Sequence, residues 1–307
     1  MFSYRGRRIY DGLSLKLNDG AVYGLLGRNG AGKTTLMRLM AGLLKCTGGR
    51  ISVNGMTPFE RRTEFLDEVC FVPESFNAPD MPVVKFADSY GVFYSHYDSG
   101  ALRGYLEAFD VNPGDSFRKL SAGQKKKALI AFALSLNTRL LLLDEPGNGL
   151  DIPSRLCLRR MLAGHRRPDR TIVLSTHQVR EVDEITDHVT VIDSGRLLLN
   201  ASLEEIAARV HFTRTGTPET GALYSERTAA GAVNIMPGAV SRTEPPELWA
   251  EDKAHHFISD QAAETEHYRS GSGVDLEVLF NACISGGRKV LEYLRSDILR
   301  EKEVRDE

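Results

Sequence analysis

One segment constrains the fold of this chain more than any other: the stretch GLLGRNGAGKTTLMRLMAG, Gly24 to Gly42. An apolar run that ends at Leu26 has the pattern of a buried strand, and the residues from Lys33 onward have the pattern of a helix. Between them, Gly27 to Thr34 matches G-x-x-x-x-G-K-[ST] in the strand, loop and helix context that this motif requires. Because strand, loop and helix coincide, we interpret the loop as a phosphate-binding loop rather than as a glycine-rich turn.

The residue types of this loop suit a phosphate ligand. Glycines let several backbone N–H groups converge on an anion, and the N-terminus of the following helix adds a partial positive charge. The Lys33 ammonium would reach the β and γ phosphates of a nucleotide, and the Thr34 hydroxyl would be a ligand of Mg²⁺. The nucleotide contacts expected from this segment are Gly27, Arg28, Asn29, Gly30, Ala31, Gly32, Lys33, Thr34 and Thr35.

A second motif, LLLLDEP at residues 140–146, is an apolar strand that ends in two carboxylates. Asp144 is placed to hold Mg²⁺ through its water shell, and Glu145 is placed to orient or deprotonate an attacking water molecule. The alternative is that the two residues merely cap the N-terminus of a helix. A phosphate loop alone does not separate kinases, GTPases and motor ATPases, so the remaining motifs must decide among them.

The apolar pattern indicates how the main domain is organised. From Gly20 to about Leu199, short apolar runs alternate with helical patterns, which predicts a mostly parallel sheet covered by helices. The expected strands are Ala21–Leu26, Leu140–Leu143, Thr171–Ser175 and Val189–Asp193. The runs LLLL and TIVLS lack polar alternation, as expected when both faces of the sheet are buried. VTVIDSGRLLLN instead predicts a hairpin that turns at Ser194 and Gly195.

Two other regions have a different pattern. Between about residues 76 and 136 the strand signal fades, while FADSYGVFYSHY and GALRGYLEAFDV have helical patterns, so we expect an inserted helical subdomain. Residues 211–273 carry scattered Gly, Thr, Pro and Glu, with a strand pair expected at ALYSE and AVNIMP. VDLEVLFNACISGGRKVLEYLRSDI then predicts a helix broken at Gly286 and Gly287. This C-terminal part contains no recognisable chemical motif.

Three further motifs complete the set: LSAGQ from Leu120 to Gln124, GNGLD at residues 147–151, and STH ending at His177. In this order and spacing the motifs closely resemble those of the nucleotide-binding subunit of an ATP-binding cassette (ABC) transporter, over about residues 2–205. The resemblance implies an α/β fold, a P-loop NTPase core with a parallel sheet, an N-terminal antiparallel β subdomain, the inserted helical subdomain and a small C-terminal extension. The implied domains are an ABC ATP-binding domain at 1–210 and an accessory region at 211–307.

The resemblance also implies roles for single residues. In the family, the residues that match Lys33, Glu145 and His177 are catalytic, and the histidine contacts the γ phosphate. Without the resemblance, His177 would be interpreted as an ordinary core or surface residue. Asp151 matches the D-loop of the family, and Tyr4 matches the aromatic residue that stacks on adenine.

LSAGQ resembles the signature motif of the family, with Ala122 in place of the commoner glycine. In the family two subunits pair head to tail, so Ser121, Gly123 and Gln124 of one chain close over ATP bound to the other. A helix that begins here offers free N–H groups and a serine hydroxyl to an anion. The run Lys125–Lys127 follows where the helix macrodipole disfavours cations. It is either a solvated basic face or a group attracted to the partner's nucleotide or to an acidic loop.

Two positions depart from the family pattern. Glu74, in FVPES, stands where most members carry the glutamine of the Q-loop. The Mg²⁺ ligands that we expect are therefore Thr34, Glu74 and Asp144. The family usually has several residues of strand before the adenine-stacking aromatic residue, but here Met1 precedes Tyr4 by only three positions. We therefore expect the natural start of translation to lie upstream.

Composition narrows the partners. Lys and Arg number 39 against 41 Asp and Glu, and the resulting net charge of −2 removes the usual electrostatic argument for a nucleic-acid partner. The four cysteines lack the short spacings of a zinc site and fit a reducing cytoplasm. No apolar stretch reaches the roughly 20 residues needed to span a bilayer, and no signal peptide is recognisable. We therefore expect action at a membrane only through a partner.

The expected function is the binding and hydrolysis of MgATP by the energy-coupling subunit of an ABC transporter. We expect this transporter to be an exporter. Its expected partners are a separate membrane-spanning permease and a second ATP-binding subunit, identical or different, at the inner face of the cell membrane. One alternative is a non-transport ABC ATPase acting on ribosomes or DNA, which the single phosphate loop and the lack of a long coiled-coil insertion disfavour. The other is a catalytically inactive regulatory cassette, which the intact Lys33, Asp144 and Glu145 disfavour.

Overall fold

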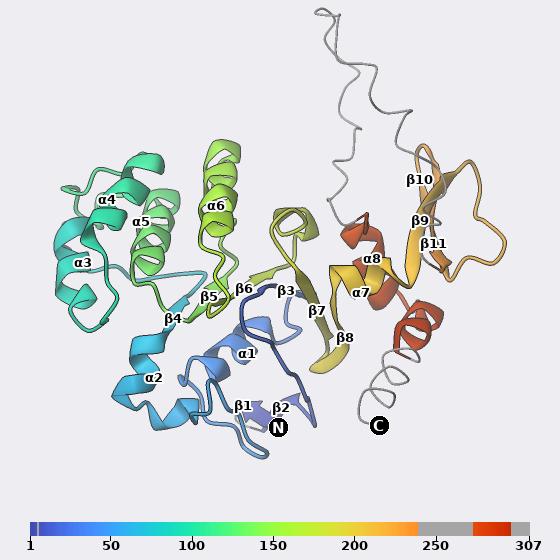
Figure 1. Cartoon of the computed structure of the whole chain (residues 1–307), viewed down its shortest axis with the longest axis horizontal. Helices are drawn as coiled ribbons and strands as arrows, with labels where there is room; N and C mark the ends of the chain where they lie inside the picture. Colours follow the sequence, from blue (N-terminus) through green and yellow to red (C-terminus); the bar gives the residue numbers. More distant parts are fainter. Residues whose placement is uncertain (5, 239–272, 296–307) are drawn as a thin grey trace, which may run out of the picture. The chain divides into compact units, whose positions relative to one another are not determined.

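The computed structural model describes residues 1–4, 6–238 and 273–295. The chain divides into two compact units, Met1–Ser202 and Leu203–Glu307, coloured in sequence order in Figure 1. This division falls at Ser202, whereas the sequence pattern places the change of character after Val210. The assignment of separate roles to the two parts stays a prediction.

A six-stranded sheet forms the centre of the first unit, in the order β4-β5-β6-β3-β7-β8. The first five strands in this order run parallel, and the edge strand β8 is antiparallel to β7. The bounds of the strands are Val69–Val72 for β4, Leu140–Asp144 for β5, Thr171–Thr176 for β6, Val22–Leu26 for β3, His188–Asp193 for β7 and Arg196–Ser202 for β8. The predicted parallel sheet is confirmed.

The predicted hairpin is confirmed at the end of this sheet. β7 and β8 are joined by Ser194 and Gly195, and Asp193 is paired with Arg196. Ser194 and Gly195 have φ angles of 47° and 74°, as in the two-residue turns that suit the twist of a hairpin. A Cβ at position 195 would collide with the backbone carbonyl of Ile9, so only glycine fits.

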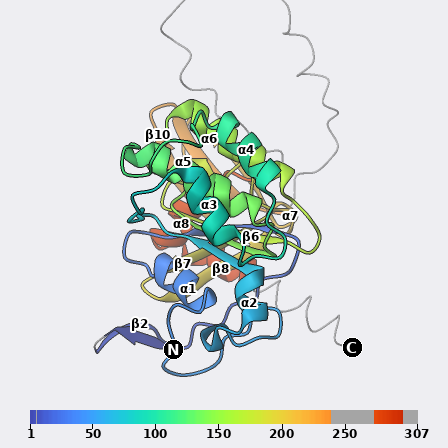
Figure 2. The ribbon, with the colours of Figure 1, turned by 90° about the vertical axis from the view of Figure 1, so that its left-hand side faces the viewer.

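Helices cover both faces of the sheet. In Figures 1 and 2, α1 (Lys33–Met40) lies on one face, while α5 (Ala122–Ser135) and α6 (Ile152–Gly164) lie on the other. On the α1 face, Met37 belongs to one buried cluster with Leu25 and Leu142 of the strands. All residues of β3, β5 and β6 are buried, which explains why their sequences lack polar alternation.

The helical region between β4 and β5 contains α3 (Val83–Gly91), α4 (Ser99–Ala108) and α5, seen together in Figure 2. The sequence pattern extended the first helix through the segment up to Tyr97, and this extension was wrong. α3 ends at Gly91, against which the ring of Tyr97 packs so closely that a Cβ would lie 2.5 Å from it. The chain therefore turns back on itself before α4 begins.

Short elements complete the first unit. At the N-terminus, β1 (Phe2–Tyr4) and β2 (Arg7–Tyr10) form a two-stranded antiparallel ladder. The remaining short helices are the 3₁₀ helix Pro58–Glu60, α2 (Thr63–Glu68) and the 3₁₀ helix Val179–Glu181.

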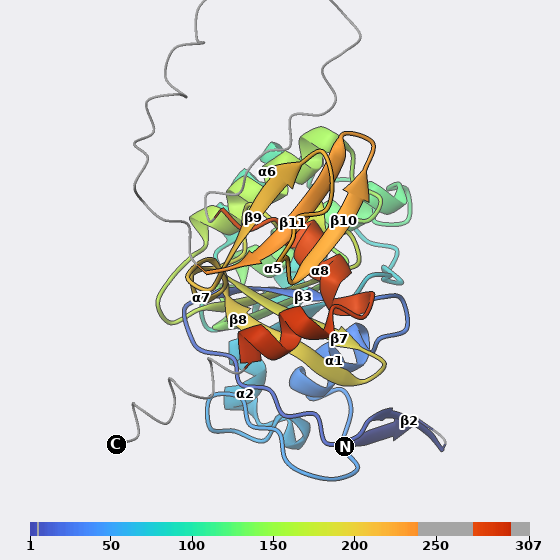
Figure 3. The ribbon, with the colours of Figure 1, turned by 90° about the vertical axis from the view of Figure 1, so that its right-hand side faces the viewer.

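The second unit contains a three-stranded antiparallel sheet in the order β10-β11-β9, shown in Figure 3. Its elements are α7 (Leu203–Ala207), β9 (Val210–Thr215), β10 (Tyr224–Thr228), β11 (Gly231–Pro237) and α8 (Leu276–Ile284). The predicted strand pair corresponds to β10 and β11, while β9 was not expected. The predicted helix break is also present, because α8 ends at Ile284 and helix resumes at 288–295. In the described part of the chain, no helix is long and apolar enough to cross a membrane.

Candidate nucleotide-binding and catalytic site

The phosphate-binding loop connects β3 to α1, and geometry requires its glycines. Gly30 and Gly32 have φ angles of 80° and 112°, in the left-handed region that residues with a side chain rarely adopt. A Cβ on Gly27 would lie 2.5 Å from the carbonyl oxygen of Ile192, so no side chain fits there. The loop thus places the free N–H groups of the α1 N-terminus where an anion would be stabilised.

The other residues of the loop divide by exposure. Arg28 and Asn29 are exposed at the tip, whereas Ala31 and Thr35 are buried. Ala31 anchors the loop through its N–H group, which donates to the carbonyl oxygen of Arg28 at 3.0 Å. The exposed tip is the part that a large ligand can reach without moving the core.

Tyr10 of β2 supports this loop, a contact that sequence reasoning missed. Its hydroxyl donates to the carbonyl oxygen of Gly32 at 2.6 Å. Burial raises the pKa of Tyr10 well above its usual value, so the hydroxyl stays protonated and can donate. Residues 10 and 32 belong to separate elements, and no local pattern signals that they meet.

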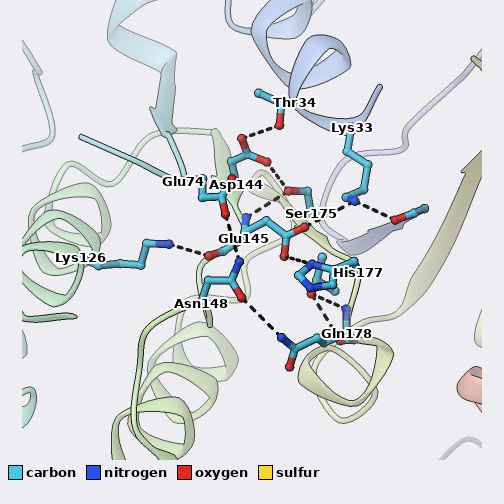
Figure 4. Close-up of polar contacts among 12 residues, drawn as sticks. Lys33, Thr34, Glu74, Lys126, Asp144, Glu145, Asn148, Ser175, His177 and Gln178 are labelled. Atoms are coloured by element: carbon cyan, nitrogen blue, oxygen red, sulfur yellow. Dashed lines mark hydrogen bonds and ion pairs between the residues drawn. The ribbon is translucent and has the colours of Figure 1, made fainter. Parts of the chain in front are cut away.

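Lys33, Glu145 and His177, which belong to three separate motifs, come together in the structure (Figure 4). The buried Lys33 ammonium donates to the carbonyl oxygen of Gly27 at 2.7 Å and lies 3.4 Å from Glu145 Oε1. His177 Nδ1 lies 2.9 Å from Glu145 Oε2. The two carboxylate oxygens of Glu145 are therefore held by groups from two different segments of the chain.

Asp144, at the end of β5, binds two hydroxyl groups. Thr34 Oγ1 donates to Asp144 Oδ2 at 2.8 Å, and Ser175 Oγ donates to Asp144 Oδ1 at 2.5 Å. The Asp144 side chain is almost completely buried. The two hydroxyl donors satisfy both oxygens of the buried carboxylate and fix its orientation beside the first turn of α1.

The backbone of Glu145 is held on both sides. Its φ angle of 47° lies in the left-handed region, although the residue carries a side chain. Its N–H group donates to the backbone oxygen of Ser175 at 3.0 Å, and its carbonyl oxygen accepts from Asn148 N at 3.2 Å. The same carbonyl oxygen accepts from Lys126 Nζ at 2.7 Å. These contacts define the direction in which the side chain leaves the backbone.

The contacts of the lysine run correct one of the interpretations of Lys125–Lys127. A solvated basic face was the first alternative, but Lys126 is 8% exposed and bonded to Glu145. Lys127 Nζ donates to the carbonyl oxygen of Phe109 at 3.2 Å. The ammonium groups of these two lysines therefore bind backbone carbonyl oxygens of the protein itself, because the long side chains can reach them.

The signature motif begins α5, as predicted. Ser121 is the N-cap and forms a capping box with Gln124: Gln124 N donates to Ser121 Oγ at 3.2 Å, and Ser121 N donates to Gln124 Oε1 at 3.0 Å. A Cβ on Gly123 would lie 2.8 Å from the carbonyl oxygen of Gly149, so the helix start packs directly on the GNGLD segment. Ser121 is exposed.

Two other motif residues lie on exposed elements. Asp151 caps α6, and the hydroxyl and N–H groups of Ser154 hold the pKa of its carboxyl below the usual value. Tyr4 on β1 is 37% exposed and packs edge-on against Phe2, with ring centroids 4.7 Å apart. Its ring is thus available to a planar ligand.

Glu74 takes part in a polar chain that the sequence did not reveal. Asn148 Nδ2 donates to Glu74 Oε1 at 3.1 Å, and Gln178 Nε2 donates to Asn148 Oδ1 at 3.5 Å (Figure 4). The chain links the FVPES segment to GNGLD and to the loop that carries His177. Because these segments are distant in sequence, only their meeting at the end of the sheet produces it.

These features define a P-loop NTPase of the ATP-binding cassette class: a phosphate loop, an Asp-Glu pair at a strand end, a capped signature helix and a histidine in contact with the glutamate of that pair. The sequence profile of the ABC transporter family matches residues 10–148. The chain is 33% identical to the nickel import ATP-binding protein NikO of Rhodobacter capsulatus, over 69% of this chain and 91% of that protein. The chain belongs to the family of ABC transporter ATP-binding subunits, which are ATPases.

Two further comparisons extend this result. The daunorubicin resistance ATP-binding protein DrrA2 of Streptomyces coeruleorubidus is 29% identical over 84% of this chain and 80% of that protein. A dimeric ATP-binding cassette in a post-hydrolysis state with ADP and Pi shares the fold, with a TM-score of 0.57 and 21% identity. That likeness covers 63% of this chain and 90% of the other.

Proposed function

We propose that this protein binds and hydrolyses MgATP at the site around Lys33 and Glu145 and drives a separate membrane-spanning permease. The observation that carries the proposal is the Glu145 carboxylate, held between Lys33 at 3.4 Å and His177 at 2.9 Å. A carboxylate fixed in this way can accept a proton from water next to a phosphate loop. In this proposal Glu145 activates water, His177 orients Glu145 and contacts the γ phosphate, and Lys33 neutralises the phosphate oxygens.

The residues present fit a nucleotide-bound Mg²⁺ ion. Thr34 and Asp144 already contact one another at 2.8 Å, and both offer oxygen atoms, which Mg²⁺ prefers. Bound there, Mg²⁺ would neutralise charge on the β and γ phosphates. Within the residues that the structure describes, no group of three or more His, Cys, Asp or Glu is arranged to hold a metal ion. Mg²⁺ on a nucleotide needs only one or two carboxylates, because phosphate oxygens and water complete its shell.

Glu74 is the third Mg²⁺ ligand in our proposal. Its carboxylate is exposed, and one of its oxygens accepts from Asn148. The second oxygen would reach the metal through water when nucleotide is bound. Tyr4 would stack on adenine, and the loop from Gly27 to Thr35 would surround the phosphates.

We propose that the active form pairs two ATP-binding subunits head to tail. Ser121 is exposed at the start of α5, and α5 and α1 lie on opposite faces of the sheet (Figure 2). A second chain is therefore the natural source of a phosphate loop for the groups Ser121, Gly123 and Gln124. The fold likeness to a cassette that is a dimer supports the same arrangement.

Export is the direction that we propose. The import relative aligns with 69% of this chain, whereas the drug-resistance relative aligns with 84%. The longer alignment spans more residues than the first unit contains, so it includes part of the second unit, and this likeness to a daunorubicin resistance ATP-binding protein supports export. Transport in the presence of the permease, from inside to outside of sealed vesicles, tests the direction.

Hydrolysis itself is tested with the purified chain and Lys33→Ala. Removing the ammonium that faces the phosphate loop should weaken ATP binding and lower phosphate release at fixed ATP, because the cation that pairs with the β and γ phosphates is lost. Equal ATP affinity for the two proteins would contradict the assignment of the phosphate loop. Fluorescent-nucleotide titration and a phosphate-release assay measure the two quantities.

A further inference from the structure

Lys126 carries a buried charge that the proposed function does not use. The residue is 8% exposed, and its Nζ atom donates to the carbonyl oxygen of Glu145 at 2.7 Å (Figure 4). Burying an ammonium is unfavourable unless it is paired, and the macrodipole near the start of α5 adds to the cost. A lysine therefore occupies this position against two opposing effects, and its bond to the Glu145 carbonyl oxygen is one of the contacts that compensate for them.

The backbone of Glu145 is strained, so a hydrogen bond to its carbonyl oxygen helps to hold it in place. A φ angle of 47° is unfavourable for a residue with a side chain by about 1–2 kcal/mol. The carbonyl of Glu145 faces α5, while its amide faces Ser175 of β6. Because the direction of the Cα–Cβ bond follows from the backbone, holding the carbonyl also sets the point from which the carboxylate reaches Lys33 and His177.

We propose that Lys126 is a positioning residue that holds the Glu145 peptide so that the carboxylate faces the attacking water. The inference rests on the proposed function, in which Glu145 activates that water. Lys126 also lies on the helix that begins with the signature residues Ser121 and Gly123. A shift of α5 toward ATP on the partner subunit is therefore transmitted through Lys126 to the Glu145 peptide of its own site.

Lys126→Met tests the proposal, since methionine keeps an unbranched apolar stem and removes the donor. We expect kcat for ATP hydrolysis to fall by about tenfold or more, because a small misplacement of a catalytic group has effects of this size. KM for ATP should stay within about twofold, because the phosphate loop is untouched. Lys126→Arg should recover most of kcat, because a guanidinium N–H can donate to the same carbonyl.

The neighbouring lysine provides a matched control. Lys127→Met also removes one charge and one bond from a lysine to a backbone carbonyl, but that carbonyl belongs to Phe109. Its kcat should therefore stay near that of the wild type. A merely structural role of Lys126 predicts equal losses in the two variants, and this result would overturn the proposal. Thermal unfolding confirms that both variants fold; if Lys126→Met does not, Lys126→Leu, which also lacks a donor, replaces it with the same expected loss.

A double-mutant cycle tests the connection to Glu145. If Lys126 acts through Glu145, adding Lys126→Met to Glu145→Gln should change the residual kcat by less than about twofold. Equal fold-losses in the wild-type and Glu145→Gln backgrounds would overturn the proposal. If the wild type hydrolyses ATP and Lys126→Met has the same kcat, this inference alone is overturned. A wild-type protein without ATP hydrolysis would overturn the proposed function as well.

Discussion

Replacing Glu145 with glutamine should tighten ATP binding while it slows hydrolysis. Lys33 Nζ lies 3.4 Å from Glu145 Oε1, and both side chains are 7% exposed. In the wild type, phosphate oxygens must therefore compete with a carboxylate for the same ammonium. The Coulomb attraction at 3.4 Å is about 5 kcal/mol at an effective dielectric of about 20.

Only part of this attraction becomes available to ATP. Desolvation of two buried charges offsets most of it, and the glutamine oxygen still accepts a hydrogen bond. We expect a net gain of about 1.4–2.8 kcal/mol, which corresponds to roughly ten- to hundredfold tighter ATP binding. Loss of the carboxylate should lower kcat by about 10²–10⁴.

Titration of a fluorescent ATP analogue without Mg²⁺ measures this affinity while hydrolysis is blocked. Glu184→Gln is the control for net charge, because Glu184 pairs with Arg159 on the exposed surface. Its affinity for ATP should equal that of the wild type. Sedimentation of Glu145→Gln with MgATP should also show an accumulated dimer. An unchanged or weaker ATP affinity of Glu145→Gln would refute the competition for Lys33.

Two further substitutions test contacts near the site. Tyr10→Phe removes the donor to Gly32 but leaves the Leu36 N–H bond at 2.9 Å on the same carbonyl, so we expect a loss of about 1 kcal/mol. The unfolding midpoint should fall by about 2–4 °C, and ATP should bind more weakly; no change in either would show that the hydroxyl does not hold the loop. Glu74→Gln keeps the acceptor for Asn148 but removes a charge, so its ATPase activity with the permease should depend less steeply on Mg²⁺ concentration. Superimposable Mg²⁺ curves for wild type and variant would leave Glu74 without a role in metal binding.

Features that are local in sequence were determined by the sequence itself. The glycines of the phosphate loop adopt backbone angles that only glycine tolerates easily, and the serine and glutamine of LSAGQ stand at the spacing of a capping box. Gly195 supplies one of the two positive φ angles of the predicted hairpin turn. Unbroken apolar runs in β5 and β6 specify strands buried on both faces. In each case the residues that form the sequence pattern are also the residues that form the loop, cap, turn or strand.

Contacts between distant segments were decided only by the tertiary structure. Tyr10 meets Gly32 across 22 positions, Lys126 meets Glu145 across 19, and Asn148 meets Glu74 across 74. Charge and periodicity indicated a basic helix face at Lys125–Lys127, but they carry no information on which backbone carbonyl lies within reach. The strand order β4-β5-β6-β3 sets which segments of the first unit lie close together, and the period and charge of the sequence do not specify that order.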